Sequence, residues 1–297
     1  MKILRATHLG MCFGVRDAIA LALNVSQTQP LSILGELVHN ENVAAALRTR
    51  GIQTVADAGS VTTATVMITA HGASERAIRR VRDRGLAVLE ATCPLVHLAH
   101  RAVAELVRTG FHPVIVGQRE HVEVRGLTED LAQFDVVLTD AEVDRLPERP
   151  RFGVAAQTTQ PVERVRRLLA RLRDRFPQSD VRFADTVCQP TKQRQAAAIE
   201  LAQQCDVVVV IGGAQSNNTR ELVATCGRFC AQVHHVQAMT DLRREWFAFA
   251  GAVGITAGTS TPDPVIAAVE NCLRQWAVEA ETRFVTPARP HGELVTR

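Results

Sequence analysis

The chain has 297 residues, of which 46% are hydrophobic and 22% charged, and its formal net charge is +3. A chain of this length can bury more than one hydrophobic core, so we expect two or three domains. Seven widely spaced cysteines are an odd number, which favours reduced thiols or metal ligands over a disulfide framework.

The charge pattern and the hydropathy exclude several classes of partner. Almost all the positive charge is arginine, and the arginines alternate with acids along helical stretches, as on solvated helix faces and unlike a nucleic-acid surface. No apolar run approaches the roughly 20 residues that a membrane span needs, and the chain opens on a strand rather than a signal peptide. We therefore expect a cytoplasmic protein with neither a nucleic-acid nor a membrane partner.

Three cysteines follow short apolar runs and precede helical patterns. Ile3-Leu4 leads to Cys12 before a helix over 15–25, the run 86–91 leads to Cys93, and 181–183 leads to Cys188 before a helix over 191–204. Each cysteine is thus predicted in a strand-to-helix turn. There the helix dipole and the free amides bias a thiol toward the thiolate, which is the form that binds soft metals.

The rest of the chain alternates strands and helices in a threefold repeat. The offset from each cysteine to a polar residue is 27, 28 and 28 positions, and a second offset grows from 59 through 65 to 72, as loop insertions would produce. The first offset ends at His39, His121 and Ser216, and the second at His71, Thr158 and Ser260. Further strands are expected at 31–34, 65–69, 113–116, 136–138, 207–211 and 253–256, and helices at 43–50, 162–172, 264–276 and after Cys93, the last with Leu98, Ala102 and Leu106 on one face.

Such alternation predicts an α/β fold of three similar lobes with mainly parallel sheets, whose ligands bind at the carboxyl ends of the strands. If these ends face one another in a pseudo-threefold arrangement, the cysteines meet at a central cluster site and the polar segments line one cavity. The alternative is three separate domains whose polar loops face solvent. We expect lobes at 1–93, 94–188 and 189–282, and a tail at 283–297.

Three thiolates leave the identity of the metal open. A structural zinc site usually takes four protein ligands, although three thiolates and a water would suit a zinc hydrolase. Iron–sulfur clusters commonly use four cysteines, and a cubane held by three would leave one iron open to substrate. The remaining thiols fit small buried hydrophobes, with Cys226 and Cys230 four apart on one helix; they are Cys205, Cys226, Cys230 and Cys272.

The polar segments resemble an anion site. Glycines, a hydroxyl and amides at a helix start suit phosphate oxygens, although an ordinary helix cap explains the same residues; these are Gly212, Gly213, Ser216, Asn217 and Asn218. Ser260 is likewise a cap or a ligand. Three histidines at equivalent addresses can donate to phosphate or relay protons; they are His39, His71 and His121.

Two further residues are candidates for chemistry. Glu123 is the preferred proton carrier, because sulfurs and phosphates nearby would raise its pKa, and its alternative role is a solvated loop glutamate. Thr158 either holds a substrate hydroxyl or caps the following helix. Neither a Walker sequence nor a G-x-G-x-x-G fingerprint occurs, so nucleotide binding is not inferred.

These residues sit in ordered motifs that resemble the 4-hydroxy-3-methylbut-2-enyl diphosphate reductase family, iron-sulfur oxidoreductases of the methylerythritol phosphate route to isoprenoids. The resemblance covers about residues 1–276. The motifs are 10–15 around Cys12, 36–40, 70–72, 91–96, 121–124, 157–159, Cys188 with Arg194-Gln195, 216–219, and 256–258 with Ser260 and Pro262-Asp263.

The resemblance implies a 4Fe-4S cluster, one per chain, on Cys12, Cys93 and Cys188, with an open iron for the hydroxyl of an allylic diphosphate. It further implies two electrons from a ferredoxin or flavodoxin, loss of water, and isopentenyl or dimethylallyl diphosphate as product. The diphosphate would be held by His39, His71, His121, Ser216, Asn217, Asn218 and Ser260, with Thr158 on the hydroxyl and Glu123 delivering protons, assisted by His121.

The chain departs from the family pattern locally. Val122 stands where a proline is usual, so we expect a less rigid loop around Glu123, and Asn217 stands where a second serine is usual. An iron-sulfur sensor or binding protein of the same fold, without reductase turnover, is the alternative function.

Overall fold

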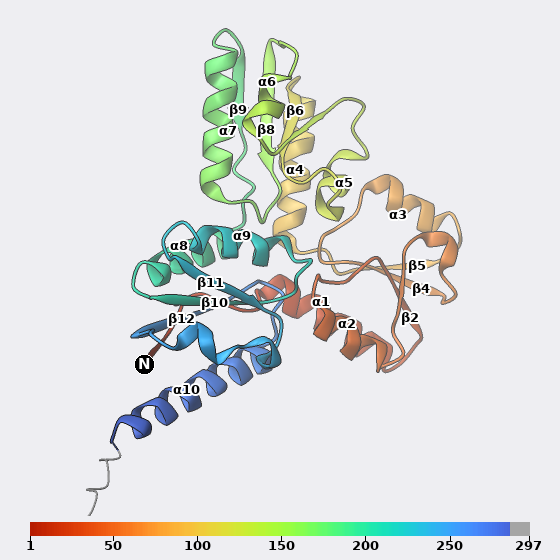
Figure 1. Ribbon diagram of the computed structural model, residues 1–297. Coiled ribbons are helices and arrows are strands. Elements are labelled where there is room, and N and C mark those ends of the chain that lie inside the picture. Colours follow the sequence, from red (N-terminus) through yellow and green to blue (C-terminus); the bar gives the residue numbers. More distant parts are fainter. Residues whose placement is uncertain (286–297) are drawn as a thin grey trace, which may run out of the picture.

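The structure is a computed structural model that describes residues 1–285 of the chain (Figure 1). Its described strands form three parallel sheets of four strands each, which Figure 1 shows as three separate lobes. The first sheet has the order β3-β2-β4-β5, the second β7-β6-β8-β9, and the third β11-β10-β12-β1. The predicted α/β fold of three similar lobes is confirmed.

The strand bounds agree closely with the predicted runs, and 31–34 and 207–211 match residue for residue. The first sheet contains β2 (Leu31–Leu34), β3 (Gln53–Val55), β4 (Thr65–Ile68) and β5 (Ala87–Glu90). The second contains β6 (His112–Val116), β7 (Asp135–Val137), β8 (Arg151–Ala156) and β9 (Asp180–Phe183). The third contains β10 (Val207–Ile211), β11 (Gln232–Val236), β12 (Ala252–Ala257) and β1 (Lys2–Arg5).

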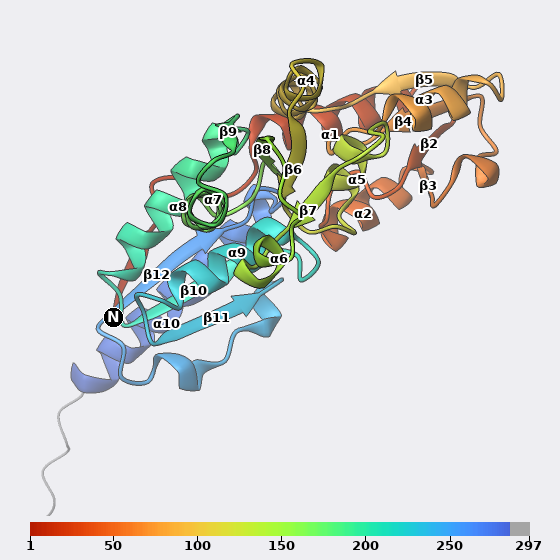
Figure 2. The same ribbon diagram turned by 90° about the horizontal axis from the view of Figure 1, so that it is seen from above.

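The helices cover the faces of the sheets, as parallel sheets require (Figure 2). They are α1 (Phe13–Ser26), α2 (Glu41–Arg48), α3 (Glu75–Arg82), α4 (Pro94–Arg108), α5 (Val122–Thr128), α6 (Asp140–Asp144), α7 (Val162–Arg175), α8 (Gln189–Ala202), α9 (Asn217–Cys226) and α10 (Asp263–Val285). Along β10, Val207 and Val209 pack toward α10, whereas Val208 and Val210 pack toward α8 and α9. This alternation explains why the strand reads as an unbroken run of apolar residues.

The N-terminal strand β1 belongs to the sheet of the third lobe, where Ile3 lies opposite Val253 of β12. The sheet of the first lobe accordingly begins at β2. With β1 in this place the lobes become equivalent, because β5, β9 and β1 each form one edge of a sheet and each leads to one of the three cysteines. The predicted lobe boundaries after residues 93, 188 and 282 remain predictions.

Two local predictions were wrong, and both concern short or ambiguous helices. The segment after β6 was predicted as a polar loop, but residues from Val122 onward form α5. On α4 the buried face consists of Val96, Ala99, Val103 and Leu106, whereas Leu98 is 50% exposed. Spacings of three and four residues keep a stripe on one face of a helix, and steps of four alone drift off it.

Helix α10 continues past the predicted end at 276 to Val285, and the predicted tail lies outside the described residues from position 286 onward. None of the described helices combines the length and the apolar character that crossing a membrane requires.

Candidate active site

The three cysteines occupy equivalent positions in the fold. Cys12, Cys93 and Cys188 are the N-caps of α1, α4 and α8, and none of their side chains makes a capping hydrogen bond. Each cysteine amide donates to a carbonyl at the end of the neighbouring strand of the same sheet. The three bonds are Cys12 N to Thr259 O at 3.2 Å, Cys93 N to Ala70 O at 3.1 Å, and Cys188 N to Thr158 O at 3.0 Å. One repeated backbone contact therefore fixes all three thiols at the strand ends.

The thiols belong to one site, and two of them, Cys93 and Cys188, are not poised as thiolates. Burial raises the pKa of Cys188 to about 11 and also raises the pKa of Cys93, and the charge of Cys12 adds to both shifts. At Cys93 and Cys188 the field of the helix dipole is therefore outweighed by loss of water, and the predicted bias toward the thiolate was wrong for these two residues. Binding of a metal group would have to release these protons.

The spacing of the thiols bears on the kind of metal. A single zinc ion requires ligand atoms within roughly 4 Å of one another. Among the described residues, the group of at least three potential ligands within 4.8 Å consists of His39, His71 and His121, and the three cysteines do not form one. The thiols are thus not arranged around a single zinc ion, and cysteine thiolates are also the ligands of iron–sulfur clusters.

Two features around the thiols were not singled out as functional from sequence. A Cβ atom on Gly14 would lie 2.5 Å from Cys93 Sγ, so only glycine lets α1 approach this thiol. The buried guanidinium of Arg194 donates to Gly10 O at 2.6 and 3.0 Å and interacts electrostatically with Cys12 and Cys188. The motif Arg194-Gln195, which follows Cys188 in the sequence, was the feature that could have pointed to Arg194.

The three histidines converge from two lobes. Their ring centroids are 4.6 Å apart for His39 and His71, 5.2 Å for His39 and His121, and 5.6 Å for His71 and His121. Burial lowers the pKa of His121 to about 4 and holds the pKa of His71 well below its ordinary value, so both rings are neutral at pH 7. The buried Nδ1 of His71 has no hydrogen-bond partner, which marks a place for a ligand atom.

The third lobe supplies the opposite wall of the same small cavity. The predicted anion residues line it together, namely Ser216, Asn217, Asn218 and Ser260, beside the three histidines and Glu123. The hydroxyl oxygen of Ser216 accepts from Thr219 N at 3.4 Å, so Ser216 caps α9 and faces the cavity at once. The buried Oδ1 of Asn217 has no partner, while its Nδ2 donates to Thr159 Oγ1 at 3.1 Å.

The glycine pair of the third lobe has a different place from the one predicted. Gly213 lies against the first lobe, and a Cβ atom there would meet His39 O at 2.6 Å. Its lack of a side chain therefore allows two lobes to approach each other beside the histidines. Gly212 and Gly213 are not among the residues lining the cavity.

Glu123 is the buried acid of the cavity. It is 1% exposed, and its carboxylate accepts from Thr158 N at 2.6 Å and from Thr158 Oγ1 at 3.0 Å. Burial raises the pKa of Glu123 to about 7, against the opposing effect of these two bonds. Since Thr158 O accepts from Cys188 N, Glu123 is tied through one threonine to a cysteine helix. The alternative role of Glu123 as a solvated loop glutamate was wrong.

Comparisons with known proteins agree with this arrangement. The family model described as LytB protein matches residues 3–274. The 4-hydroxy-3-methylbut-2-enyl diphosphate reductase of Trichlorobacter lovleyi is 34% identical over 93% of this chain and 98% of its own length, and that of Geobacter sp. (strain M21) is 35% identical over 90% and 94%.

Solved structures agree as well. A structure of (E)-4-hydroxy-3-methyl-but-2-enyl diphosphate reductase, described as the terminal enzyme of the non-mevalonate pathway, has a TM-score of 0.67 and 32% identity, over 93% of this chain and 100% of that one. The Plasmodium falciparum E-1-hydroxy-2-methyl-but-2-enyl-4-diphosphate reductase has a TM-score of 0.86 at 22% identity, over 95% and 99%, and supports the fold alone. By sequence and by architecture, the chain belongs to the LytB protein family.

Proposed function

We propose that the chain catalyses the reductive dehydroxylation of 4-hydroxy-3-methylbut-2-enyl diphosphate. The carbon–oxygen bond to the hydroxyl group breaks, and two electrons and two protons are consumed. The products are water and either isopentenyl or dimethylallyl diphosphate. The relatives named above support the reaction, and the observation that carries it here is the buried carboxyl of Glu123 beside a cavity rich in anion donors.

The substrate diphosphate would be held by hydrogen-bond donors from two sides, among which the rings of His71 and His121 are neutral. The Nδ1 atom of His121 accepts from Glu123 N at 3.1 Å, so in the neutral ring Nε2 carries the proton and can donate to a phosphate oxygen. Ser216 and the amide nitrogen of Asn218 can donate from the third lobe, because the Asn218 Oδ1 atom is already engaged by Thr259 N at 3.0 Å. Buried donors without charge bind an anion when no water competes with them. His39, His71, Asn217 and Ser260 complete the proposed set.

Glu123 would deliver the proton to carbon. With a pKa near 7 the carboxyl is about half protonated at neutral pH, which is the condition under which a side chain serves best as a general acid. The anionic diphosphate would raise this pKa further. Thr158 fixes the carboxyl by two hydrogen bonds, and its hydroxyl can turn toward the hydroxyl group of the substrate.

Cys12, Cys93 and Cys188 would hold a 4Fe-4S cluster. Such a cluster supplies the two electrons of the reduction, one at a time. The three helix N-termini and the Arg194 guanidinium provide positive potential for an anionic cluster. A small acidic electron carrier, a ferredoxin or flavodoxin, would be the source of electrons.

Anaerobic purification followed by iron and sulfide analysis tests the cofactor, and turnover with a chemical reductant tests the reaction. We expect four irons and four sulfides per chain and conversion of the hydroxylated diphosphate to five-carbon products. One zinc and no sulfide would contradict the proposal. An intact cluster without turnover would instead indicate the sensor function.

A further inference from the structure

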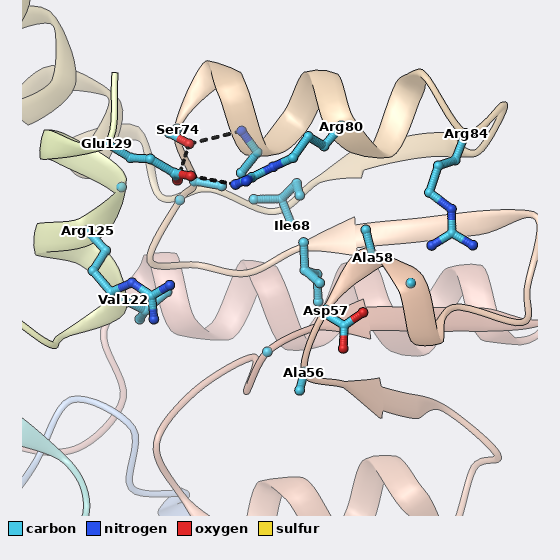
Figure 3. A pocket seen from close by; sticks show the side chains of 17 residues that line it. Ala56, Asp57, Ala58, Ile68, Ser74, Arg80, Arg84, Val122, Arg125 and Glu129 are labelled. Carbon is cyan, nitrogen blue, oxygen red and sulfur yellow. Dashed lines mark hydrogen bonds and ion pairs between the residues drawn. The ribbon is translucent and has the colours of Figure 1, made fainter. Parts of the chain in front are cut away.

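A second, larger cavity lies on the other side of the walls that enclose the candidate active site. Its volume is about 900 Å³, within the range of small-molecule sites, whereas the active-site cavity measures about 40 Å³. It opens between the first lobe and α5 of the second lobe (Figure 3). Leu34 and Ile68 mark its floor, at the carboxyl ends of β2 and β4.

The position of this cavity is one where open α/β sheets bind ligands. The chain leaves β2 toward β3 on one side and leaves β4 toward β5 on the other, so the strand order reverses between β2 and β4. The crevice beyond the strand ends at such a point is the usual ligand site of these sheets. The first lobe uses one part of its strand ends for His39 and His71, and this cavity occupies the rest.

The lining is an apolar floor with cationic ends. The partly exposed apolar side chains include Leu34 of β2 and Ala77 of α3, and Ile68 lies buried beneath them. Figure 3 shows Arg125 of α5 at one end and Arg84 at the other, near Asp57. At the Arg125 end the carboxylate of Glu129 is already engaged, because it accepts from Ser74 Oγ at 2.6 Å and pairs with Arg80. Arg125 thus offers the more favourable place for an anion.

The cavity shares two walls with the active site. On α5, Val122 and Arg125 face the cavity, while Glu123 and the cap residue His121 face the active site. In the loop after β4, Gly72 lines the cavity and the adjacent His71 lines the active site. An occupant that touches both segments fixes their separation, and with it the separation of the two histidines.

We propose that this cavity is a regulatory site for a small molecule with a phosphate or diphosphate group and an apolar body. The anionic group lies at Arg125 and the apolar body lies on the floor marked by Leu34 and Ile68. The inference rests on the proposed function only in the choice of probe, geranyl diphosphate, whose chain is built from five-carbon units of the kind proposed as product. Its ten carbons suit the larger cavity and exceed the small one.

Calorimetric titration of the anaerobic, cluster-loaded protein with geranyl diphosphate tests the site. We expect saturable binding that Arg125→Gln weakens at least about tenfold, as loss of one charge-assisted contact implies. Ala77→Phe, which places a ring on the apolar part of the lining and leaves every arginine in place, should weaken binding at least about tenfold. Arg82→Gln is the matched control, because Arg82 is on α3 but outside the lining, and it should bind as the unaltered chain does.

Three further results decide the proposal. Inorganic diphosphate should bind more weakly than geranyl diphosphate, and equal affinity would remove the role of the apolar floor. Equal losses for Arg125→Gln and Arg82→Gln, or full binding by Ala77→Phe, would overturn the site. Saturating probe should change the KM for substrate at least twofold in the unaltered chain and not in Arg125→Gln; an unchanged KM would overturn regulation. Calorimetry needs no turnover, so failure of the proposed reaction would be seen separately.

Discussion

The second and third lobes begin alike and then diverge in chemistry. Both open on a helix capped by a cysteine, and in both the next helix is capped by a residue of the active-site cavity, His121 or Ser216. Two positions after that cap the second lobe has the buried acid Glu123 and the third has the buried amide Asn218. In the first lobe the corresponding helix α2 is capped by Asn40, and Asn42, two positions after it, is exposed. The repeated fold therefore fixes where these side chains lie, whereas the residue type at each position, and with it the chemistry, differs from lobe to lobe.

Removing a shared feature should have the largest effect. Cys93→Ser exchanges a soft thiolate ligand for a hydroxyl, so we expect loss of the iron chromophore and of all turnover. Absorbance and iron content after anaerobic purification measure this. Cys272→Ser is the matched control, because Cys272 lies in α10 away from the site, and it should retain full iron content. Retention of iron by Cys93→Ser would exclude Cys93 as a ligand.

Making the second lobe resemble the third should have the next largest effect. Glu123→Gln keeps an acceptor for Thr158 but removes the proton, so we expect turnover to fall by about 10²- to 10⁴-fold with iron content unchanged. Single-turnover kinetics with reduced protein measure the loss. Glu120→Gln, an exposed neighbour in the same segment, serves as control and should be fully active. An active Glu123→Gln enzyme would eliminate the proton role.

The pH dependence sharpens the same difference between an acid and an amide. The value of kcat/KM, which depends on protonated Glu123 in the free protein, should be constant below pH 7 and fall about tenfold per pH unit above it, because burial raises the pKa of Glu123 to about 7. The folded chain holds this proton more tightly than the unfolded chain does. The contribution of Glu123 to stability therefore declines as pH rises from about 4.5 to about 7, by up to about 3 kcal/mol.

Rate profiles and urea titrations at several pH values check both statements. In Glu123→Gln the decline in stability should disappear, while the residual rate should no longer fall across pH 7. If the rate of Glu123→Gln still fell above pH 7, the fall would have to come from another titrating group.

The reverse exchange should have a smaller effect. Asn218→Asp places a carboxylate in the third lobe where the diphosphate is proposed to bind, so repulsion should raise the KM for substrate about tenfold with a smaller change in kcat. Steady-state kinetics separate the two constants. Asn42→Asp makes the same change at the exposed address of the first lobe, and its KM should match that of the unaltered chain. Equal effects of both substitutions would point to net charge instead of position.

Much of this arrangement could be predicted from sequence, because apolar runs and the offsets from the cysteines indicate which residues occupy equivalent positions in the three repeats. The offsets brought His39, His121 and Ser216 to one cavity before any contact was known. The pairing of β1 with β12 could not be predicted in this way, because it joins residues 2–5 to residues 252–255, far apart in the sequence. Local periodicity carries no information about such a long-range pairing.

The electrostatics of the site were predicted less well, because they depend on burial. Nothing in the residues near Cys188 indicates that loss of water outweighs a helix dipole and raises the thiol pKa to about 11. The same holds for His121, whose pKa falls to about 4. A seven-residue helix such as α5 also gives too short a pattern to separate it from a loop, and this hid the rigid support of Glu123.

The smallest predicted effect concerns the start of α5, where Val122 stands in place of the usual proline. Val122 is the first residue of the helix, a position whose amide has no carbonyl partner within the helix and where proline is favoured. The preceding His121 has φ −70° and ψ 137°, the extended conformation that a following proline requires. Val122→Pro should therefore fit without strain and stabilise the chain by about 0.4–1 kcal/mol through the unfolded state.

Urea unfolding measures this gain, and turnover should change less than twofold because the structure already holds Glu123 at the position that proline would favour. Leu127→Pro is the contrasting variant, since Leu127 is buried beyond the first turn of the same helix, where proline removes a helix hydrogen bond, and it should destabilise the chain by about 3 kcal/mol or more. A loss of stability in Val122→Pro would mean that the start of α5 is not fixed in this conformation. The two prolines together thus test whether the second lobe holds its acid on a preformed helix, as the third lobe holds its amide on α9.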